Sequence, residues 1–142
     1  MRTFIGEGLG RVVVLNLQRD EKVLESIRGQ LAELGIKNAI ITSAIGSLKK
    51  AVFHRVTGFE KSPVDEFVTL ENPIELASLQ GVVIDGEPHF HMVISDLGTT
   101  YTGHLEEETT VVYLAEISLV EIKGLALKRV KDENNIAVFE EK

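Results

Sequence analysis

Three of the four histidines in this 142-residue chain, His89, His91 and His104, fall close together in the sequence. Side chains two residues apart share a face of a β-strand, so His89 and His91 would point the same way with α-carbons ~6.7 Å apart. Neutral imidazoles at that spacing can converge on one cation. The residue types and their spacing therefore predict a divalent-metal site.

The third histidine is brought toward this pair by a predicted hairpin. The turn residues Asp96-Leu97-Gly98 separate two short strands, and antiparallel pairing would return His104 to a position beside residue 90. Three imidazoles suit Zn²⁺, which is the cofactor we expect, and nickel, copper or iron also fit the ligand type. The alternative is that the histidines only form hydrogen bonds on a polar strand face or line a subunit contact.

Four acidic residues and the remaining histidine are further candidates for the site. Glu75 stands in an otherwise apolar strand, where it is either an additional ligand or site acid, or an ion-paired charge at a sheet edge. The triplet 106–108 follows His104 directly, and a solvated acidic loop is the favoured interpretation. His54 is expected to be structural or surface-exposed.

The elements that must position these residues can be predicted from periodicity. Apolar residues at helical spacing from Val23 to Leu34 predict one helix, with Asp20 as its N-cap and Gly35 at its C-terminal end. Strands are predicted at 11–17, 36–45, 48–57, 67–70, 74–79, 82–84, 90–95, 100–104, 110–120, 126–130 and 136–139. This order predicts an α+β fold in a single domain over residues 1–142, a mostly antiparallel sheet with one main helix packed on it. Residues 1–9 are expected to form a flexible N-terminal arm.

Composition limits the classes of function. Twenty-two acidic and fifteen basic side chains give a formal charge of −7, which opposes non-specific attraction to nucleic acid. The absence of cysteine excludes disulfides and thiolate metal sites. No apolar run reaches the ~20 residues that span a bilayer, and the N-terminus has no apolar stretch of signal-peptide length, so a cytoplasmic protein is expected. The basic residues between 123 and 131 have acidic neighbours, which favours a solvated strand face over a phosphate site.

Several short motifs occur in an order that resembles a known family. They are Gly35-Ile36, Ile45-Gly46-Ser47-Leu48, Glu75-Leu76-Ala77-Ser78-Leu79-Gln80-Gly81, His89-Phe90-His91 and Thr102-Gly103-His104. Together they resemble the PPC domain (plants and prokaryotes conserved), also known as the PD1-like DNA-binding or DUF296 family, in its prokaryotic single-domain form. The resemblance extends from about residue 10 to residue 122.

This resemblance implies a central antiparallel sheet, assembly as a homotrimer, and a metal site built from the His-x-His and Gly-His elements. The family label also implies a DNA-binding or regulatory role. In plant members DNA contact is attributed to a separate AT-hook around Arg-Gly-Arg-Pro, which this chain lacks. Any nucleic-acid contact would then fall to Lys49, Lys50 and Arg55, gathered around a trimer axis.

Three functions are consistent with these observations. The first is a homotrimeric PPC-type protein, DNA-binding or regulatory by resemblance, that carries a three-histidine metal site. The second is a metal-dependent enzyme of hydrolytic or other Lewis-acid chemistry. The third is a non-catalytic oligomeric scaffold, since long hydrophobic strands leave edges that oligomerisation can cover. The sequence names no substrate.

Overall fold

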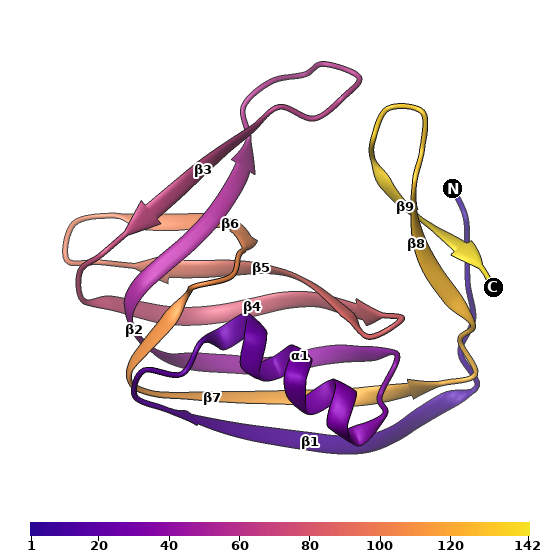
Figure 1. Ribbon diagram of the computed structural model, residues 1–142, viewed down its shortest axis with the longest axis horizontal. Coiled ribbons are helices and arrows are strands. Elements are labelled where there is room, and N and C mark those ends of the chain that lie inside the picture. Colours follow the sequence, from indigo (N-terminus) through magenta and orange to yellow (C-terminus); the bar gives the residue numbers. More distant parts are fainter.

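Alternating and β-branched segments of the chain form a sheet of seven strands in the computed structural model, which describes residues 1–142 (Figure 1). In chain order the elements are β1 (Gly8–Gln18), α1 (Val23–Leu34), β2 (Ala39–Val56), β3 (Asp65–Leu70), β4 (Ile74–Ile84), β5 (Glu87–Ser95), β6 (Thr100–Leu105), β7 (Thr110–Lys123), β8 (Leu127–Lys131) and β9 (Ala137–Glu141). The strand order is β1-β7-β2-β4-β5-β6 with β3 paired to β2, and β8 and β9 form a separate hairpin. All these pairings are antiparallel, which confirms the predicted sheet.

The single helix packs on one face of the sheet and supplies part of its core. Its apolar stripe, Val23, Leu24, Ile27 and Leu31, is buried, in agreement with the predicted periodicity. Gly35 adopts the left-handed conformation predicted for the helix end, with φ 67°. The predicted N-cap was wrong. Lys22 occupies that position without a side-chain hydrogen bond to the helix, because the preceding turn separates Asp20 from the first helical residue.

Strand β2 is continuous where the sequence predicted two strands divided at Gly46-Ser47. Gly46 does not turn the chain. It lies close against β7, because a Cβ at this position would stand 2.6 Å from the carbonyl oxygen of Leu114 and 2.7 Å from the Cα of Ala115. The glycine therefore permits close strand packing in the middle of an 18-residue strand.

Strand β4 likewise joins two predicted strands. It pairs with β5 from Glu75 to Ile84, through Gln80 and Gly81, which lay between the two predicted strands. The actual turn follows at Asp85-Gly86, where both residues have positive φ. Because β4 and β5 stay in register from Ser78 to Ile84, beyond a bulge at residues 76–78, the position of each histidine on β5 is fixed by a long ladder rather than by a short hairpin.

The sheet closes on itself at one end. The first half of β2 pairs with β4, and its second half pairs with β6 at Phe53↔Leu105 and His54↔His104. Strands β2, β4, β5 and β6 therefore form a ring of hydrogen-bonded neighbours. This closure brings residues from three strands to one place.

The β8–β9 hairpin stands beside this ring, with the N-terminal segment along it (Figure 1). Phe4 packs edge-on against Phe139, with ring centroids 6.3 Å apart, and Arg2 donates a hydrogen bond to the carbonyl of Phe139. The segment predicted to be a free arm therefore contacts the hairpin. Separately, no helix in the structure combines the length and hydrophobicity needed to traverse a bilayer.

Candidate metal centre

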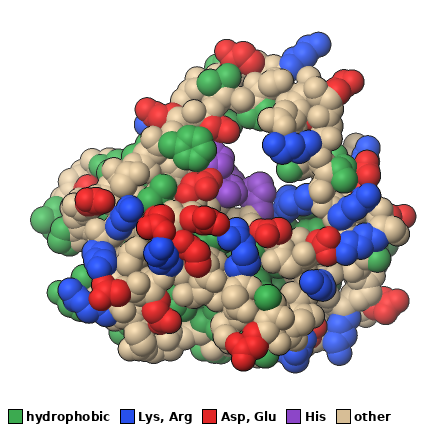
Figure 2. Space-filling model, in the orientation of Figure 1, with side chains coloured by type: hydrophobic (Ala, Val, Ile, Leu, Met, Phe, Trp, Pro, Cys, Tyr) green, Lys and Arg blue, Asp and Glu red, His purple; other side chains and the backbone are tan.

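The three histidines predicted to act together do lie together. His91 pairs directly with His104 across β5 and β6, one residue from the predicted register. His89 and His91 share a face of β5, with ring centroids 5.5 Å apart, while Phe90 and Met92 between and beside them are buried. The His104 ring lies 4.7 Å from the His89 ring and 5.6 Å from the His91 ring. Figure 2 shows histidine side chains at the base of a hollow in this face of the molecule.

His54, which the sequence analysis did not include among the ligands, also joins this cluster. It lies opposite His104 on β2, and the two rings stack with centroids 4.5 Å apart and 22° between their planes. Its side chain is 23% exposed, so it is neither buried in the core nor free on the surface. No local motif marks His54, because only the closure of β2 on β6 places it beside His104. A fourth histidine in a chain with three clustered ones was the only sequence signal.

Gly103 makes this closure possible. A Cβ at position 103 would stand 2.5 Å from the ring of Phe53 and 2.7 Å from the carbonyl oxygen of His54. Any larger residue would push β6 away from β2. Gly103 therefore allows β6 to pack closely against β2, which places His104 beside His54.

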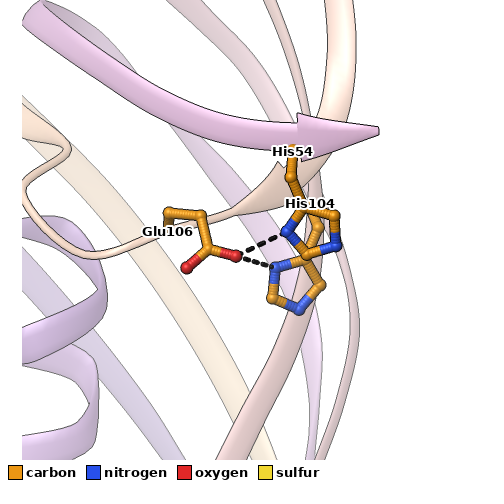
Figure 3. A group of neighbouring side chains, drawn as sticks. All are labelled: His54, His104 and Glu106. Atoms are coloured by element: carbon orange, nitrogen blue, oxygen red, sulfur yellow. Dashed lines mark hydrogen bonds and ion pairs between the residues drawn. The ribbon is translucent and has the colours of Figure 1, made fainter. Parts of the chain in front are cut away.

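Glu106 links two of the histidines. Its Oε1 atom accepts hydrogen bonds from the Nδ1 atoms of His54, at 2.6 Å, and of His104, at 3.1 Å (Figure 3). An imidazole that donates through Nδ1 leaves Nε2 available as a metal ligand, and carboxylates commonly orient metal-binding histidines in this way. The sequence favoured a solvated acidic loop for this residue, but its side chain is only 28% exposed and bound to both rings.

The donor set fits a divalent ion of borderline softness. Two imidazoles that bind one tetrahedral zinc through ring nitrogens would have centroids roughly 5 Å apart, and the observed separations run from 4.5 to 5.6 Å. Potential ligand atoms of His54, His104 and Glu106 all lie within 4.8 Å of one another. His104 belongs to every close pair except that of His89 with His91, so it is the centre of the cluster.

The surroundings favour the neutral form of two of the histidines. Burial, followed by the positive charges of Arg129 and the other histidines, lowers the pKa of His89 to about 4. Burial and His54 also lower the pKa of His104, against the opposing effect of Glu106. Uncharged imidazoles retain the lone pairs that a metal requires.

The remaining carboxylates lie elsewhere. Glu75 pairs with Ser47 and Ser95, and Ser95 is four residues along β5 from His91, or ~13 Å at strand spacing. It is exposed, so within one chain it does not join the histidines. The last two residues of the acidic triplet form ion pairs, Glu107 with Arg28 and Glu108 with Lys22 and Lys50.

The three basic residues proposed for nucleic-acid contact are each beside a carboxylate. Lys49 pairs with Asp20, Lys50 lies 3.9 Å from Glu108, and Arg55 pairs with Glu66 at 2.8 Å. Phosphate contacts by these side chains would have to compete with their acidic neighbours. The structure does not gather them into a free positive surface.

Solved structures with the same fold include two of appreciable sequence similarity. A metal-containing protein from Archaeoglobus fulgidus is 29% identical, with a TM-score of 0.84 over 99% of this chain and 100% of that one. A plant- and prokaryote-conserved (PPC) protein from Pyrococcus horikoshii is 33% identical, with a TM-score of 0.83 over 100% of this chain and 99% of that one.

A third structure, from Bacteroides thetaiotaomicron, is described as a candidate DNA-binding protein. It is 15% identical, with a TM-score of 0.78 over 96% of each chain, which shows a shared fold alone. No curated protein sequence matches the chain significantly. The profile of the Plants and Prokaryotes Conserved (PCC) domain matches residues 5–123, so the chain belongs to this family, as its motifs indicated.

Proposed function

We propose that this PCC-domain protein binds one divalent metal ion, preferably zinc, at the histidine cluster. The observation that carries the proposal is the convergence of all four histidines of the chain, from three strands, around His104. His89, His91 and His104 are the primary ligands, as the sequence predicted, and Glu106 orients His104 and His54 through their Nδ1 atoms. The metal-containing relative from Archaeoglobus fulgidus supports this proposal.

A bound ion would supply Lewis-acid polarisation of a substrate oxygen. The residues of this chain would hold His89 and His104 neutral by burial and admit a small ligand from the hollow side of the cluster (Figure 2). Whether the site is catalytic or only structural depends on whether three or four protein ligands bind the ion, because catalytic zinc sites keep one position open.

Metal content tests the proposal. Plasma mass spectrometry on untagged protein purified without chelator should find about one zinc or similar ion per chain, and His104→Ala should lose it. His104→Gln provides a second variant of similar size if the alanine variant folds poorly. Gln80→Ala is the matched control, since Gln80 pairs with His91 without offering an imidazole. Full metal retention in both His104 variants would reject the site.

The proposed oligomer is a homotrimer. Large apolar side chains of β1, β2 and β7 are exposed, among them Val12, Val14, Ile45 and Tyr113, and exposed apolar surface marks interaction sites. An open groove of about 660 Å³ is lined in part by Ile45, Tyr113 and Glu75. A second copy would cover this face, and Glu75 could then complete a neighbouring subunit's metal shell. Sedimentation should give three times the chain mass of 15.7 kDa.

Binding to DNA stays a prediction from the family label. The charge of −7 and the acidic partners of Lys49, Lys50 and Arg55 weigh against it. A titration with duplex DNA at low salt tests it, because phosphate contacts give an affinity that falls steeply as salt rises. Saturable, salt-sensitive binding would restore DNA as the partner.

A further inference from the structure

One arginine beside the histidine cluster has no acidic partner in the structure. Arg129 lies on β8, outside the residues 5–123 that match the family profile. It lines a small open pocket of about 260 Å³ together with His89, His91, Gly81 and Phe139. The sequence suggested a solvated strand face for the basic residues of this segment, but Arg129 is half-buried while its neighbour Lys128 is exposed.

The guanidinium of Arg129 is held in place. Phe139 lies opposite it in the β8–β9 register, and the Cζ atom stands 4.6 Å from the centre of the Phe139 ring. Such stacking orients the planar guanidinium and leaves its N–H edge free to donate. The Phe139 ring is itself supported by Phe4. The hairpin thus presents a preorganised cation rather than a mobile surface charge.

No acidic group neutralises this cation. Four other arginines, Arg11, Arg19, Arg28 and Arg55, each lie within ion-pair distance of a carboxylate. Arg129 has no such partner, and its Nε atom is buried without a hydrogen bond. Burial alone lowers its pKa, with no carboxylate acting in the opposite direction. A desolvated, unpaired guanidinium costs stability, so a site of this kind is expected to serve a ligand.

We propose that Arg129 binds the oxyanion group of a small anionic ligand, a carboxylate or a phosphate, in the pocket it shares with His89 and His91. The forked N–H groups of arginine match two oxygens of either anion. Arg129 also indicates that the substrate of the metal centre is an anionic small molecule, and this part of the inference rests on the proposed function. The anion site itself depends only on Arg129 and the pocket.

The test is a titration of the full-length, zinc-free protein with sodium phosphate, and separately with sodium acetate, at constant ionic strength. Backbone amide shifts in NMR spectra report binding. We expect saturable shifts at Gly81, Val82 and His89, stronger with the preferred anion. Arg129→Gln should weaken binding about tenfold or more, because it removes a charge-assisted pair of hydrogen bonds. Lys128→Gln, which removes the same charge from the exposed side of β8, should change it less than about twofold.

Three results would overturn the proposal. They are no saturable shift with either anion, equal weakening by the two variants, and unchanged affinity in Arg129→Gln. Thermal melting of Arg129→Gln establishes that the variant is folded, and Arg129→Lys, which keeps the charge without the fork, should bind at intermediate strength. Zinc content measured on the same samples separates the two proposals. Anion binding in a protein that takes up no zinc would support the anion site and overturn its link to a metal.

Discussion

Replacing Glu106 with glutamine tests whether the carboxylate orients the histidines. In the structure one oxygen of Glu106 accepts from two imidazoles, at 2.6 Å and 3.1 Å. Glutamine has nearly the same shape and keeps a carbonyl acceptor, but it loses the negative charge. The change therefore removes electrostatic support from His54 and His104 and leaves the fold intact.

The magnitude follows from the strength of such hydrogen bonds. Bonds to a charged group contribute about 1.5–3 kcal/mol and neutral ones about 0.5–1.5 kcal/mol, so the loss is about 1–1.5 kcal/mol per bond and about 2–3 kcal/mol for both. Solvent screening reduces this loss to about 1–2 kcal/mol, because Glu106 is 28% exposed. Since 1.4 kcal/mol corresponds to a factor of ten, zinc affinity should fall about tenfold. Removing a carboxylate from behind a ligating histidine has an effect of this size.

The assay is competition for zinc between the protein and a chromogenic chelator at neutral pH. Glu107→Gln is the matched control, because Glu107 is adjacent, pairs with Arg28 and touches no histidine. Its affinity should equal that of the unaltered protein. If Glu106→Gln also binds zinc within twofold of the unaltered protein, the orienting role is refuted. A loss far beyond tenfold would instead make Glu106 a direct ligand.

Three further predictions concern pH, packing and assembly. As the pH falls from ~6.5 to ~4, the free energy of unfolding of the zinc-free protein should decrease by about 1–2 kcal/mol, because His89 has a pKa of about 4 when folded and takes up a proton in this window only when unfolded. Urea unfolding at several pH values measures this decrease. A His89→Gln variant with an equally steep pH profile would contradict it. Gly103→Ala should cost about 1–3 kcal/mol and lower the melting temperature and zinc affinity, since its Cβ would overlap β2. Gly98→Ala, whose Cβ would meet only an Asp96 carboxylate oxygen at 3.8 Å, should melt like the unaltered protein. Tyr113→Glu, on the exposed apolar face, should dissociate the proposed trimer in sedimentation experiments, and an unchanged mass would place the interface elsewhere.

Much of the fold could be predicted because its signals are local. The helix stripe from Val23 to Leu31 and the left-handed Gly35 depend on residues a turn apart. The turn at residues 96–98 fixed the β5–β6 hairpin to within one residue of the predicted register, so His91 and His104 were correctly brought together. One failure is at Gly46, where a glycine interpreted as a break between two strands permits close packing between β2 and β7.

The sequence by itself determined where the helix and the extended segments lie and which histidines share a face, because periodicity of two or 3.6 residues and short turns act over a few neighbours. Only the tertiary structure decided the rest of the site. His54 and Glu106 are 52 residues apart and meet because β2 closes on β6. Arg129 meets His89 and His91 because a C-terminal hairpin stands beside the ring of strands. Such contacts depend on the path of the whole chain, and no local pattern of residues encodes them.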